Sequence, residues 1–178
     1  MMSAAVHAAE LIGPADLSNP SRWEPVEGTP AAEAVVEDGK PVLKLPCPFS
    51  KLEGWRYYWD FPLEADLSSH RWIKLRARAE DPGAVSGLTV YFESGSGWYR
   101  SHMGGLKKEW TTLMGTRVRF GTEGAPGGWS GVARMRLAVM PGARRDTVVY
   151  LGGMEGTSAI GVDDATRVGH CRSLEELR

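Results

Sequence analysis

Apolar and polar residues alternate one by one along several short segments of this chain, and this period of two constrains the fold more than any other feature. In residues 72–79, for example, Ile73, Leu75, Ala77 and Ala79 are separated by charged residues. Successive side chains of a β-strand point to opposite faces, so this alternation indicates strands with one buried face. Helical periodicity is almost absent.

Nine segments show this strand pattern. They are residues 34–36, 42–45, 54–61, 72–79, 88–93, 98–103, 111–120, 135–140 and 147–151. Turn residues separate them, and the glycine-rich stretch 121–128 is expected to be a mobile loop. About nine strands in one flat sheet would leave a face and two edges uncovered. We therefore expect an all-β fold, an antiparallel two-sheet β-sandwich (jelly roll) of about nine strands with an irregular C-terminal tail.

The same alternation assigns side chains to faces. The predicted core rows are Ile73 with Leu75, Leu88 with Val90 and Phe92, and Met135 with Leu137 and Val139. The residues between them point outward; they include Lys74, Arg76, Arg78, Tyr91, Glu93, Arg134 and Arg136. If these strands share one sheet, its outer face is rich in Arg. In 54–61, Trp55, Tyr57, Trp59 and Phe61 form the predicted core face, which leaves Arg56 and Tyr58 outside.

The chain of 178 residues fits one domain with short extensions. We expect a leader or signal remnant at residues 1–20, the β-sandwich at 21–156, and a linker or the start of a following domain at 157–178. Ser173 and Glu176 have the spacing of a capping box, which favours a helix start. Small residues near the N-terminus resemble the end of a signal peptide, so the expected location is secreted or periplasmic. A disordered leader would look the same.

Charge and cysteine content restrict the partners. Lys and Arg total 21 against 22 Asp and Glu, so no bulk field favours nucleic acid or anionic lipid, and no run of about 18 apolar residues spans a membrane. Cys47 and Cys171 either pair in an oxidising compartment or, as we favour, are one buried thiol and one tail thiol. We expect neither a nucleic-acid nor a membrane partner.

Catalytic patterns are weak. There is no H-E-x-x-H sequence, cysteine cluster or nucleophile elbow. A glycosidase needs two facing carboxylates, but the predicted outward face carries only Glu93. A polysaccharide lyase could use Tyr99, Arg100 and His102, although Tyr99 and Arg100 should point to opposite faces of a regular strand. We expect no catalytic residues.

The order of several motifs is familiar. Asp66-Leu67 and a short turn precede the alternating strand at 72–79, Gly97 precedes Trp98, Gly128 precedes Trp129, and residues 148–151 form a last apolar strand. Over Trp23 to Met154 the sequence resembles the galactose-binding-like jelly-roll domains. Many of these are carbohydrate-binding modules attached to glycoside hydrolases or polysaccharide lyases, and the resemblance implies the same role here.

The resemblance also raises the question of calcium, which many such domains bind through an Asp pair in the last strand. Here Gly152 and Gly153 stand at that position, so the resemblance does not carry the site over. Glu155 and Glu27 could still contribute oxygens to a structural calcium. We expect no cofactor.

Sugar recognition needs flat aromatic surfaces and a few fixed hydrogen-bonding groups. Trp98 leaves the turn 94–97, where its ring can be exposed, whereas Trp23, Trp110 and Trp129 are expected to cap the core. The candidate ligand-binding residues are Trp98, Tyr91, Glu93, Arg100, Arg134, Arg136, Arg76 and Tyr58.

The leading hypothesis is a non-catalytic module that binds a polysaccharide or oligosaccharide. An acidic glycan is favoured if Lys74, Arg76, Arg78, Arg134 and Arg136 share one surface. The expected second partner is a catalytic domain in the same native chain. Two alternatives remain, namely a structural accessory sandwich packed on a neighbouring glycoside hydrolase domain, and a jelly-roll lyase.

Overall fold

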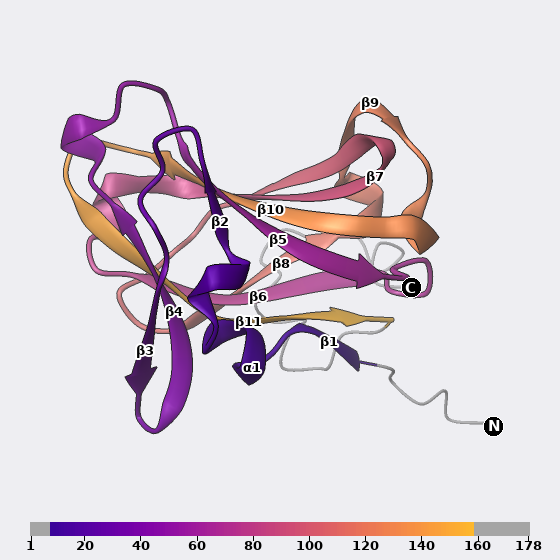
Figure 1. Ribbon diagram of the computed structural model, residues 1–178, viewed down its shortest axis with the longest axis horizontal. Coiled ribbons are helices and arrows are strands. Elements are labelled where there is room, and N and C mark those ends of the chain that lie inside the picture. Colours follow the sequence, from indigo (N-terminus) through magenta and orange to yellow (C-terminus); the bar gives the residue numbers. More distant parts are fainter. Residues whose placement is uncertain (1–7, 159–178) are drawn as a thin grey trace, which may run out of the picture.

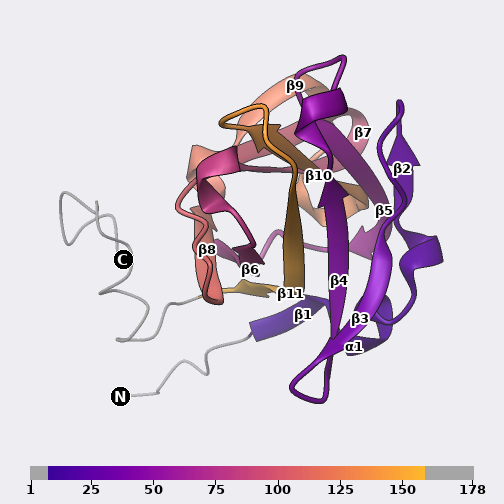
Figure 2. The same ribbon diagram turned by 90° about the vertical axis from the view of Figure 1, so that its left-hand side faces the viewer.

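A computed structural model describes residues 8–158, which form two antiparallel sheets packed face to face (Figure 1; Figure 2). Sheet A contains, in spatial order, β3 (Glu33–Glu37), β4 (Lys40–Cys47), β11 (Thr147–Thr157), β6 (Trp72–Ala79) and β8 (Thr111–Thr116), and β1 (Ala8–Ile12) pairs with the end of β11. Sheet B contains β2 (Glu24–Val26), β5 (Tyr57–Ala65), β10 (Val132–Pro141), β7 (Val85–Met103) and β9 (Gly121–Pro126). The predicted two-sheet sandwich is confirmed.

Helices are short in the described part of the chain. The α-helix α1 covers Pro14–Leu17, and the 3-10 turns η1 (Pro20–Arg22), η2 (Phe49–Lys51), η3 (Pro82–Ala84), η4 (Arg117–Arg119) and η5 (Trp129–Gly131) connect strands. Within residues 8–158 no helix has the length and apolar character needed to cross a membrane.

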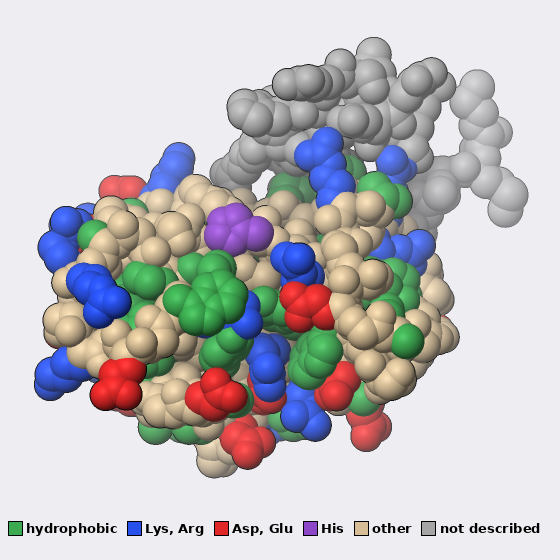
Figure 3. All heavy atoms as spheres, turned by 90° about the horizontal axis from the view of Figure 1, so that it is seen from above, with side chains coloured by type: hydrophobic (Ala, Val, Ile, Leu, Met, Phe, Trp, Pro, Cys, Tyr) green, Lys and Arg blue, Asp and Glu red, His purple; other side chains and the backbone are tan. Residues whose placement is uncertain are grey.

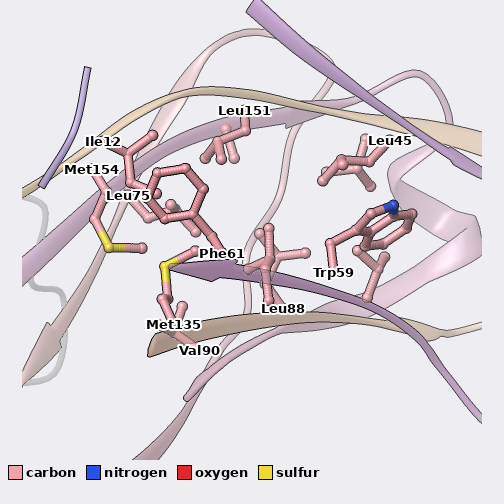
Figure 4. Close-up of a cluster of buried hydrophobic side chains, with 14 of the residues drawn as sticks. Ile12, Leu45, Trp59, Phe61, Leu75, Leu88, Val90, Met135, Leu151 and Met154 are labelled. Carbon is pink, nitrogen blue, oxygen red and sulfur yellow. The ribbon is translucent and has the colours of Figure 1, made fainter. Parts of the chain in front are cut away.

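The core lies between the two sheets and contains the apolar rows that the alternation predicts. Leu75, Leu151 and Met154 of sheet A face Phe61 and Met135 of sheet B (Figure 4). Ile73, Ala77, Leu88, Phe92, Leu137 and Val139 are also buried. Because successive side chains of a strand point to opposite faces, the neighbours of each core residue must point away from the core. The core rows therefore determine which residues lie on the outer faces of the two sheets.

β7 folds back on itself as a hairpin. The side chains of Thr89 and His102 lie 3.2 Å apart although 13 residues separate them, a distance of about 43 Å along a straight strand. The rings of Tyr91 and Trp98 also meet, with centroids 6.2 Å apart. The two strands expected at 88–93 and 98–103 are therefore present as the two arms of β7, and Gly95, at a φ of +60°, lies between them.

The loop expected at 121–128 is wrong, because residues 121–126 form the edge strand β9. It pairs with the second arm of β7, from Gly95 opposite Pro126 to Arg100 opposite Gly121. Five of its six residues are exposed, so no apolar alternation marks it as a strand.

Residues 8–20, which fall in the expected leader or signal remnant, form β1 and α1 on the sandwich. β1 pairs with β11, and Ile12 and Leu17 are buried in the core with Trp23. A run as short as five residues gives little periodicity to detect. The expectations for the tail, including Cys171 and the Ser173 to Glu176 capping box, lie outside the described residues.

The pairing of β9 depends on the absence of a side chain at Gly97. A Cβ there would lie 2.5 Å from the backbone nitrogens of Ala125 and Pro126. We predict that Gly97→Ala lowers the free energy of unfolding by about 2 kcal/mol or more, because β9 must move away. The matched control Gly121→Ala, in the same strand pair but with nothing within 4 Å, should change it by less than about 0.5 kcal/mol in urea denaturation. Equal stability of the two variants would contradict the described pairing.

Candidate functional site

A row of outward side chains crosses four neighbouring strands of sheet B. Arg136 on β10 lies between Asp60 on β5 and Tyr91 on β7. The edge of Tyr91 meets Trp98 on the second arm of β7, and Trp98 lies opposite Glu123 on β9. We call the outward surface of these strands the sheet B face; Figure 3 looks down onto this side, where acidic, basic and apolar side chains are interspersed.

Arg136 is the centre of the sheet B face. Its Nε and Nη2 atoms donate to the two carboxylate oxygens of Asp60, at 2.5 and 2.8 Å. Its guanidinium carbon is 5.2 Å from the ring centroid of Tyr58 and 5.0 Å from that of Trp98. The hydrogen bond to Asp60 holds the pKa of Arg136 above its usual value. We call this Arg136–Asp60 pair the fork; it holds the guanidinium beside the rings of both Tyr58 and Trp98.

The positive charges of two further Arg side chains on the sheet B face are also neutralised by carboxylates. Arg134 forms ion pairs with Asp60 at 3.3 Å and with Glu93 at 3.0 Å. Arg100 pairs with Glu123 at 2.7 Å, and both side chains are half exposed. The structure thus brings together seven of the eight predicted ligand-binding residues, namely Tyr58, Tyr91, Glu93, Trp98, Arg100, Arg134 and Arg136.

Trp55 and Arg56 extend the sheet B face and were missed as site residues. The guanidinium of Arg56 lies 3.8 Å from the ring centroid of Trp55 and 4.3 Å from that of Tyr58, and its Nη1 donates to the Tyr91 hydroxyl at 2.6 Å. Trp55 is 61% exposed, so its prediction as a core residue is wrong. β5 begins only at Tyr57, and strand alternation does not apply to residues before it. The available signal in the sequence was Gly54, a turn-favouring residue directly before Trp55.

A cavity of about 640 Å³ adjoins the sheet B face beside β2. Asp60 and Arg134 belong to its lining, together with Trp23, Glu24, Pro62 and Ala133. It therefore continues the row of polar and aromatic side chains past β5.

Arg76, the eighth predicted residue, lies elsewhere. β6 belongs to sheet A, so Lys74, Arg76 and Arg78 point away from the opposite side of the sandwich. Arg76 lies 4.3 Å from the ring of Trp110, and Arg78 lies 3.9 Å from Tyr150 and pairs with Glu37. The predicted single Arg-rich face is wrong, because alternation assigns a residue to a face of its own sheet but does not say which sheet the strand joins.

The Trp residues expected to cap the core differ in position. Trp129 packs against Phe92 and Phe120, which confirms the expectation, and Trp23 is fully buried. Trp110 instead lies against Arg76 and Arg78 on the outer side of sheet A, so its expected role is wrong.

The candidate lyase residues do not converge. Tyr99 stacks on Trp129 at 4.0 Å, toward the core. Arg100 and His102 belong to the outer face, where His102 is hydrogen bonded to Thr89. The expected opposition of Tyr99 and Arg100 is confirmed.

The residues considered for metal and disulfide chemistry are dispersed. Glu155 on β11 pairs with Lys74 at 3.3 Å, whereas Glu27 follows β2 of the other sheet. In residues 8–158 no three His, Cys, Asp or Glu side chains gather as a metal site. Cys47 is buried, which raises the pKa of its thiol, and Cys171 lies outside the described residues.

Solved structures with a similar fold include carbohydrate-binding modules and part of an agarase. The family 11 carbohydrate-binding module from Clostridium thermocellum, solved with a β-1,3-1,4-mixed-linked tetrasaccharide, superposes with a TM-score of 0.60 at 10% identity, over 76% of this chain and 88% of the module. The chain shares the two-sheet β-sandwich fold of this module. A family 30 module gives 0.54 at 12% identity, over 84% and 86% of the two chains.

Part of an enzyme is similar as well. The agarase AgWH50C superposes with a TM-score of 0.60 at 13% identity, over 88% of this chain but 25% of the agarase. No protein-family model and no curated protein matches the sequence. At these identities the similarity shows the fold alone.

The Arg136–Asp60 fork can be tested by its effect on stability. The Asp60 side chain is only 6% exposed, so Arg136→Met leaves a buried carboxylate with the longer contact to Arg134. We predict a loss of about 3 kcal/mol in the free energy of unfolding. Arg134→Met, on the same strand but half exposed, should cost at most about 1 kcal/mol. In an Asp60→Asn background the difference should shrink; a persistent difference would show that the fork is not its cause.

Proposed function

We propose that this chain is a non-catalytic carbohydrate-binding module that binds a polysaccharide chain across the strands of the sheet B face. The observation that carries the proposal is the row formed by Trp98, Tyr91, Arg136, Tyr58 and Asp60, in which the guanidinium–carboxylate fork lies beside aromatic rings. Tyr91 is only 5% exposed, so it supports the Trp98 ring and offers little surface of its own.

This row has the two properties that sugar recognition needs. Aromatic rings stack against the apolar faces of pyranose rings, and Trp55, Tyr58 and Trp98 retain exposed surface for this purpose. Polar groups must be held in place before the ligand arrives. Arg136 donates through Nε and Nη2 to Asp60, which leaves the N–H groups of Nη1 for sugar hydroxyls. The adjoining cavity offers Glu24 as a further acceptor.

The same pairing opposes catalysis. A glycosidase needs one carboxylic acid that can give its proton to the leaving group and a second carboxylate facing it. Asp60 and Glu93 are the carboxylates nearest the centre of the sheet B face, and both are engaged by Arg134. Tyr99 faces the core and does not join Arg100 and His102. The face therefore suits binding rather than bond cleavage.

An uncharged glycan fits the sheet B face better than an acidic one. The acidic preference required five cationic residues on one surface, and three of them belong to sheet A. Of the four Arg residues on the sheet B face, Arg100, Arg134 and Arg136 are neutralised by Asp60, Glu93 and Glu123. Arg56 is held by the tyrosine hydroxyls of Tyr58 and Tyr91.

Export and a catalytic neighbour complete the proposal. A secreted or periplasmic location is part of the proposal, because it would bring the module into contact with polysaccharides outside the cytoplasm. The region of the agarase that resembles this chain is about a quarter of a longer enzyme, which supports a role beside a catalytic domain in the native protein. The same observation favours the alternative of a structural accessory domain, in which the exposed aromatic residues would contact that neighbour.

The binding module and the structural accessory domain differ in what Trp98 contacts, which is a glycan in the first case and a neighbouring domain in the second. We predict that Trp98→Ala weakens retention on polysaccharide affinity gels, including mixed-linkage β-glucan, agar and arabinan, by about tenfold or more on the gel that retains the wild type. Val118→Ala, an exposed apolar residue on η4, should leave retention unchanged and serves as the control. Retention that survives Trp98→Ala and Tyr91→Ala would contradict binding at the sheet B face, and absence of retention on every gel would favour the structural role.

Ionic strength tests the class of glycan. Because the cations of the sheet B face are paired, we predict that the dissociation constant changes by less than about twofold between 50 and 500 mM NaCl, whereas binding to an uncompensated Arg cluster would weaken steeply. Isothermal titration calorimetry at the two salt concentrations measures this, with a polyuronate as the comparison ligand. Salt-sensitive binding that prefers the polyuronate would contradict an uncharged ligand.

A further inference from the structure

The outer side of sheet A contains a separate cavity, on the opposite side of the sandwich from the sheet B face. Its volume is about 320 Å³, within the lower range of small-ligand sites. We call it the sheet A notch; its polar lining residues are Glu10, Lys74, Arg76, Thr112 and Glu155. Arg76 is the predicted ligand-binding residue that the sheet B face does not contain.

Glycines in β11 open the sheet A notch. Leu151 pairs with Ala77 and Met154 with Leu75, so Gly152 and Gly153 together face the single residue Arg76 as a β-bulge. Gly153 has a φ of +127°, which other residues rarely adopt. A Cβ on Gly152 would lie 2.9 Å from Nη1 of Arg76 and 3.0 Å from the Trp110 ring. Any side chain at this position would therefore crowd the residues at the rim.

Trp110 fixes the guanidinium of Arg76 at the rim of the sheet A notch. The guanidinium carbon is 4.3 Å from the ring centroid, and Arg76 is exposed. Arg76 forms no ion pair with an acidic side chain in residues 8–158. The Trp110 ring therefore positions the Arg76 guanidinium at the cavity, and no described carboxylate occupies its N–H groups.

The remaining groups supply acceptors, further donors and no net charge. Lys74 and Glu155 form an ion pair at 3.3 Å and place a donor beside an acceptor. Thr112 adds a hydroxyl, and Glu10 adds a second carboxylate. Among the described lining residues, two cations balance two carboxylates, and Ile12, Pro14 and Met154 form an apolar wall. Paired donors and acceptors beside a partly apolar wall suit an uncharged sugar ring that carries several hydroxyl groups.

We propose that the sheet A notch is a second saccharide site, which takes a single uncharged pyranose unit through Arg76, Thr112 and the Lys74–Glu155 pair. It relies on the proposed function only for the class of ligand. Because the two sites lie on opposite outer faces, one module would hold two glycan chains or two parts of one long chain. Such bivalency raises retention on a dense polysaccharide without new contacts at either site.

The test follows the backbone amide signals of Thr112, Gly152 and Gly153 in ¹H–¹⁵N NMR spectra. The probes are the methyl β-glycosides of D-glucose, D-galactose, D-mannose and D-xylose, with methyl β-D-glucuronoside for comparison. The wild type is titrated beside Trp98→Ala, which disables the sheet B face, and beside Arg76→Gln. Lys44→Gln is the matched control, a cation on the outer side of sheet A that pairs with Glu33 away from the notch.

We expect at least one uncharged glycoside to move the three signals saturably, equally in the wild type, Trp98→Ala and Lys44→Gln, and about tenfold more weakly in Arg76→Gln. The proposal is overturned if no uncharged glycoside moves them, if only the glucuronoside does, if Trp98→Ala abolishes the effect, or if Arg76→Gln binds as well as the wild type. Failure of the sheet B face leaves these signals unaffected, so the two proposals fail separately.

Discussion

Burial of every second side chain between two sheets is the constraint on which the rest of this structure depends. The rows of Ile73, Leu137 and Phe92 are withdrawn from water together, and each such side chain stabilises the fold by about 2 kcal/mol. Their neighbours along the strands are consequently forced outward in register. The row from Trp98 to Asp60 exists because β9, β7, β10 and β5 share this register.

The period of two was sufficient to predict the two-sheet fold and the faces of β6, β7 and β10, because burial there leaves a clear pattern. It was insufficient for β9, whose residues are almost all exposed, and for β1, which is too short to show a period. Within the site, Tyr91 and Arg136 could be placed on outward faces. The sequence could not predict that Arg76 lies on the other sheet, because strand order depends on contacts between residues far apart in sequence. Trp55 was misassigned because it lies before the start of β5.

Charge compensation is the feature that distinguishes the two outer faces from a general anion-binding surface. Asp60 is nearly buried, and its fork with Arg136 sets the spacing of Tyr58 and Trp98. On the other side, Trp110 holds Arg76 without neutralising it, and the carboxylates of Glu10 and Glu155 balance the local charge. In both places aromatic rings position a guanidinium for directional hydrogen bonds, which suits hydroxyl groups better than a diffuse negative field.

The central claim is that a glycan lies across the sheet B face. The seven Trp residues each give one indole N–H signal, so they report on both sheets and the core in one spectrum. Titration with an oligosaccharide of the retained polysaccharide should move the signals of Trp98 and Trp55 and leave that of the fully buried Trp59 unchanged. Saturable binding with the Trp98 signal unmoved would contradict the account.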